Sequence, residues 1–284
     1  MPYAFSALRD APIGLFDSGL GGTTVLSKLA KLLPHENILY FGDTARLPYG
    51  DKTPAQILEY SAAILKWMAS QGVKMVLMGC NTSSALAYPY LNSLPAFNFP
   101  VFDIIRPFAQ NLASGKKTIG VFATPASVKS DMHKKIIQHY HPNIDVLTVS
   151  CPEWVSIIEN GEIEKAETAF QVKKYVEPIL EQGAEALVYG CTHYPLLGHI
   201  FRQAIPDYLS HIEMIDPADF LIQKAIQYLS DHDLLRQNIE SLGKTQFYVT
   251  GDTQLFSDNM QRIWGNRQHV EHASLLFTEK LKIV

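Results

Sequence analysis

Short apolar runs alternate along the chain with longer amphipathic stretches. The runs are rich in valine, isoleucine and aromatic residues and are too short for buried helices, so each predicts a β-strand covered on both faces. The stretches between them repeat apolar residues at helical spacing and predict helices. The predicted strands are 13–17, 37–42, 73–79, 101–104, 118–123, 144–150, 185–190, 212–215 and 245–250. The predicted helices are 22–33, 53–70, 84–92, 126–140, 164–182, 217–229 and 252–264.

The alternation of strands and helices predicts an α/β fold with mainly parallel sheets flanked by helices. In such sheets a ligand lies beyond the carboxyl ends of the strands. The residues that directly follow each strand are therefore the first candidates for a functional site.

The pattern also repeats once within the chain. Ile-Gly-Leu-Phe at 13–16 is echoed by Ile-Gly-Val-Phe at 119–122, and Val-Leu-Met-Gly-Cys-Asn-Thr at 76–82 is echoed by Leu-Val-Tyr-Gly-Cys-Thr-His at 187–193. The echoes come in the same order and at similar spacing. We therefore predict two similar α/β domains related by a pseudo-twofold axis, which places the two repeated cysteines on opposite sides of a cleft.

Size, charge and cysteine content narrow the class of protein. The chain has 284 residues, of which 47% are hydrophobic and 18% charged, which suits two globular domains rather than a disordered chain. A formal net charge of -4 gives no basic surplus for nucleic acid or an anionic membrane. The 3 cysteines argue against a disulfide framework and for a reducing compartment. With no signal peptide or membrane-length apolar run in the sequence, a cytoplasmic protein is expected.

Two cysteines end apolar strands just before predicted helices. Cys80 lies in Gly-Cys-Asn-Thr, and Cys191 lies in Gly-Cys-Thr-His. One such cysteine is usually a small buried hydrophobe, but two in equivalent positions of a duplicated chain indicate chemistry. Free N–H groups at a helix start favour a thiolate and bind carboxylates. Inversion of a stereocentre needs a base on one side and an acid on the other, which a thiolate and a thiol can supply.

These cysteines need help, because an unperturbed thiol has a pKa of about 8.5. Asp17 ends the first strand and is a candidate to relay a proton for Cys80. His193, two residues beyond Cys191, is the candidate on the other side. The alternatives are a helix N-cap for Asp17 and a structural role for His193.

The turn at 17–23, Asp-Ser-Gly-Leu-Gly-Gly-Thr, joins the first strand to a helix. A dinucleotide loop needs glycine where Thr24 stands, and no Gly-Lys-Ser/Thr follows, so a nucleotide-phosphate loop is excluded. A pocket for a small anion, built from Ser18 and backbone N–H groups, fits better. 

A second loop at the ligand edge, residues 40–50, ends in Pro48-Tyr49-Gly50. It can present backbone N–H groups and a phenol to a carboxylate, although proline and glycine also favour an ordinary turn.

The remaining candidates are expected to be structural. A helix begins at Cys151-Pro152-Glu153 and ends at Asn160-Gly161, and within it Glu159 is an ordinary surface carboxylate as far as its chemistry alone shows. Cys151 lacks a partner motif. No cysteine and histidine set has the spacing of metal ligands, so no metal site is predicted. Three histidines are expected at a solvated helix end: His133, His139 and His141.

Together these motifs resemble those of bacterial glutamate racemases, in the aspartate/glutamate racemase superfamily. They are Asp-Ser-Gly-x-Gly-Gly, Tyr-Phe-Gly-Asp-Thr-Ala-Arg-x-Pro-Tyr-Gly, Gly-Cys-Asn-Thr, Cys-Pro with a following Glu, Gly-Cys-Thr-His-Tyr-Pro-Leu-Leu and a late Thr-Gly-Asp. The likeness runs from Ile13 to Trp264. The tyrosine-glycine loop and Gly-Cys-Thr-His-Tyr-Pro separate the chain from aspartate racemases, hydantoin racemases and arylmalonate decarboxylases, the last of which keep only one of the two cysteines.

The resemblance implies an isomerase that interconverts L- and D-glutamate without a cofactor and supplies D-glutamate for peptidoglycan synthesis in cell wall biogenesis. It implies that Cys80 exchanges a proton with D-glutamate and Cys191 with L-glutamate. Asp17 would assist Cys80, and His193 and Glu159 would assist Cys191.

The resemblance also implies substrate contacts and domain limits. The α-carboxylate and amino group would be held by Asn81, Thr82, Thr124, Ser127 and Thr192. The side-chain carboxylate would be received by Ser18, Tyr49 and Gly50, with Pro48 in the same loop. The first domain would comprise 1–104 plus 214–284 and the second 105–213, with the active site in the cleft between them.

The family often forms dimers, so a homodimer is one expected assembly. Members that depend on a peptidoglycan-precursor activator tend to carry a longer N-terminal extension than the short stretch before Ile13, so no activator is expected. 

The chain departs from the family pattern at 123–127, where Ala-Thr-Pro-Ala-Ser replaces a Gly-Thr-x-Gly-Thr loop. Two alternatives remain: an aspartate racemase with the same thiol pair, and a binding protein that keeps the pocket without turnover.

Overall fold

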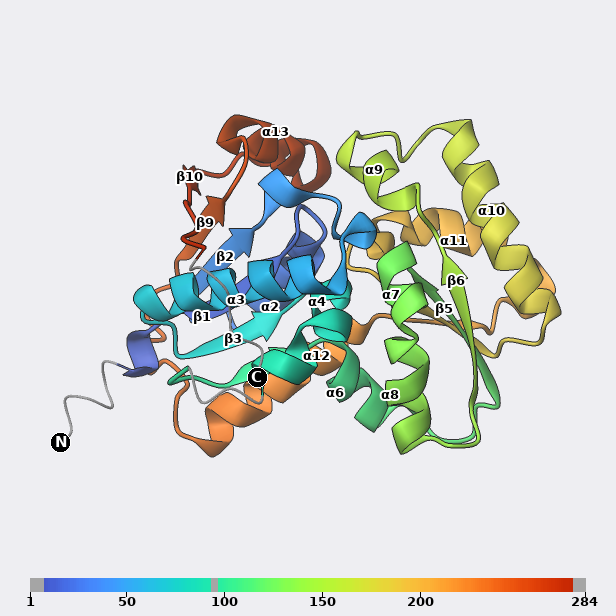
Figure 1. The fold of residues 1–284 in the computed structure, drawn as a ribbon, viewed down its shortest axis with the longest axis horizontal. Helices are drawn as coiled ribbons and strands as arrows, with labels where there is room; N and C mark the ends of the chain where they lie inside the picture. Colours follow the sequence, from blue (N-terminus) through green and yellow to red (C-terminus); the bar gives the residue numbers. More distant parts are fainter. Residues whose placement is uncertain (1–7, 93–96, 278–284) are drawn as a thin grey trace.

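The computed structural model describes residues 8–92 and 97–277. Two sheets lie side by side, each flanked by helices (Figure 1). The first sheet has the strand order β10-β9-β2-β1-β3-β4, and the second has the order β6-β5-β7-β8. All the strand pairs of the described residues are parallel. The fold class predicted from the sequence is therefore confirmed.

The strands of the first sheet are β1 (Ile13–Asp17), β2 (Ile38–Gly42), β3 (Met75–Met78), β4 (Val101–Asp103), β9 (Thr245–Val249) and β10 (Val270–His272). Those of the second are β5 (Thr118–Ala123), β6 (Asp145–Ser150), β7 (Ala186–Gly190) and β8 (Glu213–Ile215). The longer helices are α2 (Gly22–Leu32), α3 (Pro54–Ser70), α8 (Met132–Tyr140), α10 (Ala166–Glu181), α12 (Pro217–Asp231) and α13 (Thr253–Trp264). The shorter helices are α4 (Asn81–Leu86), α5 (Tyr88–Leu91), α6 (Ile105–Asn111), α7 (Pro125–Ser130), α9 (Trp154–Glu159) and α11 (Gly198–Ala204).

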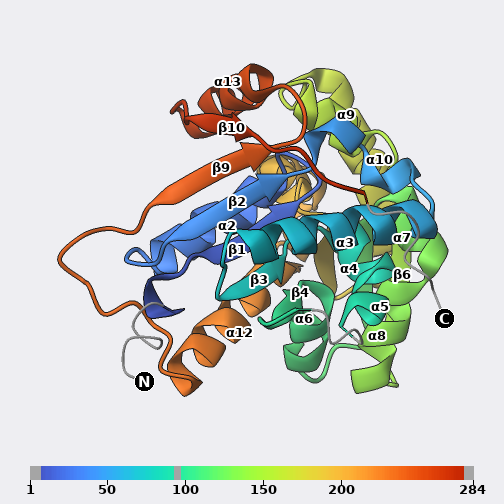
Figure 2. The ribbon, with the colours of Figure 1, turned by 60° about the vertical axis from the view of Figure 1, so that its left-hand side comes forward.

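The central strands are rich in buried apolar residues because helices flank the sheets (Figure 2). Successive side chains of a strand point to opposite faces. In β1, Ile13 and Leu15 pack into a core shared with α2 and α12. Phe16 packs into a separate core with α3. The first of these cores continues into the second sheet, where it includes residues of β5, β6 and β7.

The two sheets share a topology. β2-β1-β3-β4 of the first corresponds in order to β6-β5-β7-β8 of the second. Cys80 follows β3 and Cys191 follows β7, so the two cysteines occupy matching positions. The second of the proposed domain limits, between residues 213 and 214, falls inside β8, which pairs with β7.

The predicted strands form with slightly trimmed ends, but some helices differ. Helix 84–92 begins at Asn81 and is divided into α4 and α5, since Pro89 cannot continue the hydrogen-bonding pattern of α4. Helix 126–140 is divided at Asp131, whose φ of 59° is left-handed. Three elements have no separate counterpart in the prediction: α6, α11 and β10. They are short, and the polar sequence of β10 carries no strand signal.

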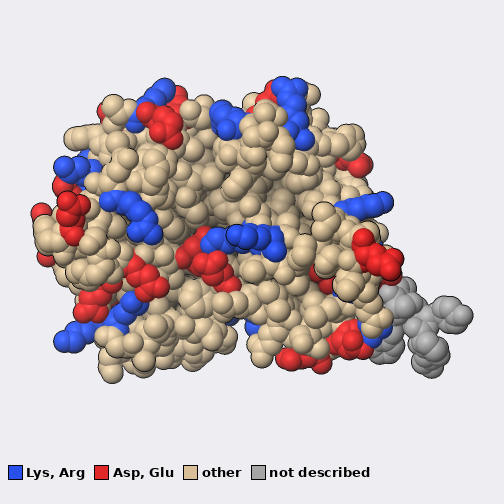
Figure 3. Space-filling view, turned by 180° about the vertical axis from the view of Figure 1, so that it is seen from behind, with Lys and Arg blue, Asp and Glu red and all other residues tan. Residues whose placement is uncertain are grey.

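Charged side chains of both signs are interspersed over the back of the molecule, so this face has no continuous basic surface (Figure 3). Within the described ranges, no helix has both the length and the apolar character needed to cross a membrane.

Candidate active site

A small cavity lies where the carboxyl ends of the strands of both sheets meet. Its walls come from segments that follow β1, β2, β3, β5, β6 and β7, as expected for parallel sheets. The lining residues are Ser18, Tyr49, Gly50, Cys80, Asn81, Thr82, Thr124, Val155, Cys191, Thr192 and His193. All except Val155 were predicted from the sequence. Val155 was missed because an apolar residue within a predicted helix gives no chemical signal.

The cavity is nearly closed. The cavity volume is about 10 Å³, which is roughly enough for one water molecule. Both cysteines are at its wall and are almost fully buried. An amino acid does not fit this volume, so its entry requires the walls to move apart.

On the first side of the cavity, Cys80 ends the loop after β3 at the N-cap position of α4. Burial, and next the negative charge of Asp17, raise the pKa of Cys80 to about 12, and interactions with Ser83 offset part of that increase. Cys80 is therefore a neutral thiol in this arrangement at neutral pH.

Asp17 is fully buried, and burial raises its pKa. Its Oδ1 accepts a hydrogen bond from the Gly19 N–H at 3.0 Å, and its Oδ2 accepts one from the Thr192 hydroxyl at 2.9 Å. Asp17 acts on Cys80 through its charge. The Thr192 contact links the end of β1 to the segment after β7.

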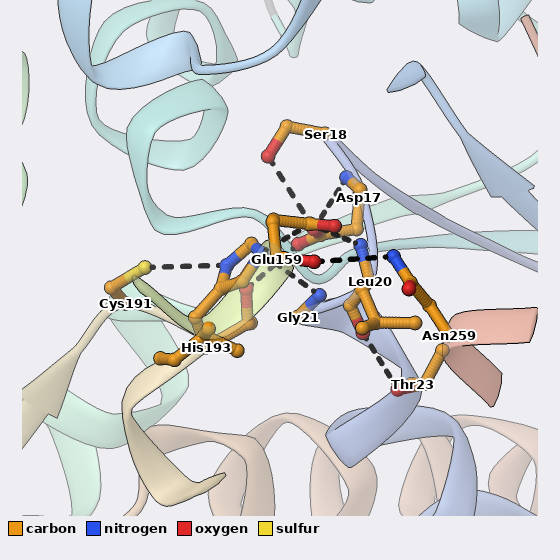
Figure 4. Close-up of polar contacts among 12 residues, drawn as sticks. Asp17, Ser18, Leu20, Gly21, Thr23, Glu159, Cys191, His193 and Asn259 are labelled. Atoms are coloured by element: carbon orange, nitrogen blue, oxygen red, sulfur yellow. Dashed lines mark hydrogen bonds and ion pairs between the residues drawn. The ribbon is translucent and has the colours of Figure 1, made fainter. Parts of the chain in front are cut away.

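On the second side, a chain of contacts ends at Cys191 (Figure 4). The Cys191 sulfur lies 3.7 Å from His193 Nδ1, and His193 Nε2 lies 2.8 Å from Glu159 Oε1. Burial would lower the pKa of His193, but its contacts with Cys191 and Glu159 raise it well above the usual value. Burial would raise the pKa of Glu159, but the hydrogen bond from His193 leads a set of interactions that hold it below its usual value. The pair is therefore an imidazolium and a carboxylate.

Protonated His193 donates from both ring nitrogens. The Gly21 N–H also lies 3.2 Å from Nε2, but a protonated nitrogen has no lone pair left to accept it. The approach of this backbone to the ring explains why residue 21 is glycine, because a Cβ there would collide with the imidazole.

Glu159 is held by both halves of the molecule. Its Oε1 accepts the Leu20 N–H at 2.9 Å. Its backbone carbonyl oxygen, at the C-terminus of α9, accepts hydrogen bonds from Arg262 Nη2 at 2.9 Å and from Asn259 Nδ2 at 3.4 Å, both on α13. A cation at a helix C-terminus is favourable. Glu159 is therefore not the ordinary surface carboxylate that its sequence context indicates.

A cluster of hydroxyl groups joins the two halves on the other wall. Thr82 Oγ1 lies 3.0 Å from Thr124 Oγ1 and 3.3 Å from Ser127 Oγ. Thr124 caps α7, and Pro125 takes the first helical position, where its missing N–H has no cost. The unusual 123–127 loop thus still presents two hydroxyls, although Ser127 lies behind the cavity wall.

The loop that follows β2 contributes through its backbone. The Tyr49 phenol donates to Asp43 Oδ2 at 2.6 Å, so it is not free for a carboxylate ligand, contrary to one expectation from the sequence. Gly50 packs so closely on Thr124 that a Cβ would lie 2.9 Å from the Thr124 Cβ. Pro48 precedes these residues and does not itself line the cavity.

The prediction for the histidines of 133–141 was partly wrong. His139 is exposed and His141 partly buried. His133, however, is buried, and its Nε2 lies 3.2 Å from Asn81 Oδ1. The helix α8 packs against α4 and turns this residue inward. The helical register could have placed His133 beside Ile136 and Ile137 on the buried face.

The third cysteine is away from the cavity. Cys151 is buried in the core of the second half, and its sulfur lies 3.7 Å from the Val149 carbonyl oxygen. All three cysteines are free thiols. In the described ranges, no group of three or more histidine, cysteine or acidic side chains could hold a metal ion.

Comparison with known proteins gives consistent matches. The family model described as Asp/Glu/Hydantoin racemase matches residues 13–225. A glutamate racemase of Rippkaea orientalis is 44% identical over 272 residues, covering 96% of this chain and 94% of the relative. 

Among solved structures, glutamate racemase from Francisella tularensis in complex with D-glutamate has a TM-score of 0.85 and 32% identity, covering 94% of this chain and 98% of that one. The enzyme from Thermus thermophilus, in complex with β-chloro-D-alanine, has a TM-score of 0.82 and 35% identity, with the same coverage.

Proposed function

The chain belongs to the family of Asp/Glu/hydantoin racemases, which are amino-acid isomerases, and we propose that it is a glutamate racemase that works without a cofactor. The observation that carries this proposal is the placement of Cys80 and Cys191. They follow matching strands of two similarly ordered sheets and line one cavity. The relatives' names favour glutamate over aspartate as the substrate.

The proposed reaction is a proton transfer at Cα. In the L-to-D direction the Cys191 thiolate removes the Cα proton, and the Cys80 thiol donates its proton to the opposite side of the carbon. The products are D-glutamate, a Cys191 thiol and a Cys80 thiolate. The D-to-L direction reverses both transfers.

The neighbouring groups support these roles. His193 is close enough to Cys191 to exchange a proton with its sulfur, and Glu159 holds the imidazole in place and balances its charge. Burial, together with the charge of Asp17, raises the pKa of Cys80 and keeps it a proton donor. Because the Cα–H is a very weak acid, the fixed donors around the substrate carboxylate must stabilise the charge that develops.

The substrate contacts are proposed from the cavity wall. The residues proposed to bind the α-carboxylate and amino group are Asn81, Thr82, Thr124 and Thr192, which line the cavity, while Ser127 contacts the Thr82 and Thr124 hydroxyls. Ser18 and the backbone N–H groups of Tyr49 and Gly50 are proposed to bind the side-chain carboxylate. The Tyr49 phenol is not proposed for this role because it donates to Asp43.

The closed cavity implies domain motion. We propose 1–104 plus 214–284 and 105–213 as the two bodies that separate to admit glutamate and close for the reaction. Small-angle scattering with and without saturating glutamate tests this motion, and identical profiles would count against it.

The proposed cellular role is the supply of D-glutamate for peptidoglycan synthesis in the cytoplasm. The proposed partner is free L- or D-glutamate, and a homodimer without an activator is the proposed active form.

The direct test is incubation with L-glutamate in deuterated water, followed by optical rotation and by deuterium at Cα. Loss of rotation with deuterium incorporation is expected. The rate of deuterium incorporation should fall by roughly 10²–10⁴-fold in Cys80→Ser and in Cys191→Ser, because each change removes an acid/base group. The matched control is Cys151→Ser, which should keep the parent rate. Exchange on aspartate but not glutamate would assign the chain to a different substrate. Absence of exchange on both would leave a binding role.

A further inference from the structure

His133 and Asn81 meet across the boundary between the two halves. His133 lies on α8, and Asn81 is the first residue of α4, directly after Cys80. Each residue is 2% exposed. The His133 Nε2 lies 3.2 Å from Asn81 Oδ1. His133 does not line the cavity, whereas Asn81 does.

The protonation of His133 follows from its surroundings. Burial lowers the pKa of His133 to about 4, so the ring is neutral at neutral pH. A neutral imidazole carries one N–H, and an amide oxygen can only accept a hydrogen bond. The contact with Asn81 Oδ1 therefore requires the proton of His133 to be on Nε2.

The other end of the Asn81 amide has no protein partner. Asn81 Nδ2 is buried and forms no hydrogen bond with any described residue. A buried donor without a partner is unfavourable. Because Asn81 lines the cavity and its oxygen is occupied by His133, the Nδ2 group is left to meet an acceptor on a ligand.

Rotation of the amide would reverse this arrangement. An asparagine amide can exchange the places of its oxygen and nitrogen by a half turn about its last bond. With the His133 proton kept on Nε2, the rotated form would bring two donors together at His133 and turn the Asn81 oxygen toward the ligand, so it also requires the ring to move its proton to Nδ1. That oxygen would repel a substrate carboxylate, so the orientation of one amide decides whether this wall attracts or repels the substrate.

We propose that His133 is a positioning residue that locks the Asn81 amide with Nδ2 toward the substrate carboxylate. The inference rests on the proposed glutamate racemase activity for its ligand, but the hydrogen bond between the two residues can be tested without turnover. The Asn81 Nδ2 group stabilises the carboxylate of the bound substrate and of the transition state alike. Loss of this hydrogen bond should therefore raise KM more than it lowers kcat.

The kinetic test compares His133→Phe, His133→Gln and Asn81→Ala, with the exposed His139→Phe as the control on the same helix. His133→Phe is expected to raise KM for glutamate about tenfold, the scale of one hydrogen bond to a charged group. His133→Gln keeps an N–H donor and should recover most of the loss. In the Asn81→Ala background, His133→Phe should add nothing further. Equal effects of the Phe and Gln variants, or additivity with Asn81→Ala, would overturn the proposal.

A spectroscopic test keeps the two proposals separate. Nitrogen NMR of protein labelled at histidine and asparagine is expected to show a neutral His133 with the proton on Nε2, and a side-chain amide signal of Asn81 that changes in His133→Phe. An unprotonated Nε2 in the parent would overturn the role of His133 whether or not the protein racemises glutamate. If the parent fails to racemise glutamate but shows this tautomer and this coupling, the proposed activity fails and the lock on Asn81 stands.

Discussion

The two sides of the cavity carry the same residue but surround it differently. Cys80 is influenced by an anion, Asp17, that is hydrogen bonded to other groups and acts through its charge. Cys191 is in direct contact with a histidine whose proton is held by a carboxylate. Two halves with the same strand order have therefore diverged in their local electrostatics.

The difference has a chemical consequence. The negative charge near Cys80 and its burial favour the thiol, which is ready to donate a proton. The imidazolium beside Cys191 provides a nearby site for proton exchange. In the proposed reaction this difference suits the L-to-D direction, in which Cys191 removes the proton of L-glutamate and Cys80 donates one.

The strongest test of this comparison is His193→Asn, which removes the proton partner of Cys191 but keeps a polar side chain. We expect kcat to fall by roughly 10²-fold or more, the usual scale for an acid/base group. Since the two enantiomers are equally stable, kcat/KM must remain equal in both directions. The asymmetry should instead appear in the isotope effects of Cα-deuterated substrates.

For His193→Asn the isotope effect should rise with L-glutamate, where the impaired side breaks the C–D bond, and fall with D-glutamate. Asp17→Asn, on the opposite side, is the matched variant and should show the reverse. Equal changes for both enantiomers in either variant would show that the two sides are not specialised.

A second test is Glu159→Gln, which keeps the shape of the side chain and removes its charge. The pKa of His193 is raised by its contacts with Cys191 and Glu159, so the substitution should lower the His193 midpoint in an NMR titration. In the pH profile of kcat/KM, the decrease that accompanies deprotonation of His193 should move to lower pH. Activity at neutral pH should then fall roughly tenfold. Glu162→Gln, at a partly exposed neighbour whose carboxylate pairs with Lys165, is the control and should leave the midpoint in place.

The same pair makes a contribution to stability with a definite sign. The raised folded-state pKa of His193 stabilises the protein fully below about pH 6.5 and ceases to do so as pH rises through the folded value. The lowered pKa of Glu159 stabilises above about pH 4.3 and is lost as pH falls through its folded value. Chemical denaturation of Glu159→Gln should therefore show its deficit mainly between the lowered folded-state pKa of Glu159 and the raised folded-state pKa of His193. A deficit that is unchanged at low pH would contradict the pairing.

Much of this comparison was visible in the sequence, because strand ends and repeated motifs are local features. The nine predicted strands, the position of Cys80 and Cys191 after them, and the nearness of His193 to Cys191 all follow from short-range patterns. The contacts that distinguish the two sides are long-range. Glu159 approaches Leu20 and His193 only after the halves have packed, and no spacing rule connects these positions.

His133 is a second example of a long-range contact that the sequence did not predict. The sequence grouped His133 with His139 and His141 at a solvated helix end, but the packing of α8 on α4 turns it inward. Similarly, the sequence of the 40–50 loop suggested the Tyr49 phenol as a carboxylate ligand, but this phenol donates a hydrogen bond to Asp43. Sequence patterns predicted which residues surround the cavity better than which atoms face it.

The smallest expected effect concerns the hydrogen bonds that hold the end of α9, which carries Glu159, against α13. Arg262 of α13 donates to the carbonyl oxygens of Ile158 and Glu159 at the end of α9. Arg262→Met keeps an apolar chain of similar shape but loses these bonds and the favourable charge at the helix terminus, worth about 0.3–2 kcal/mol. We expect Glu159 to lose its fixed position and kcat to fall by a few-fold, with Arg267→Met as the exposed control.

In a Glu159→Gln background, Arg262→Met should lower kcat much less. The hydrogen bonds from Arg262 then hold a side chain that no longer stabilises the imidazolium. If instead the losses multiply in the double variant, or if activity is intact while thermal stability falls, Arg262 supports the fold of this region and has no part in placing His193 beside Cys191.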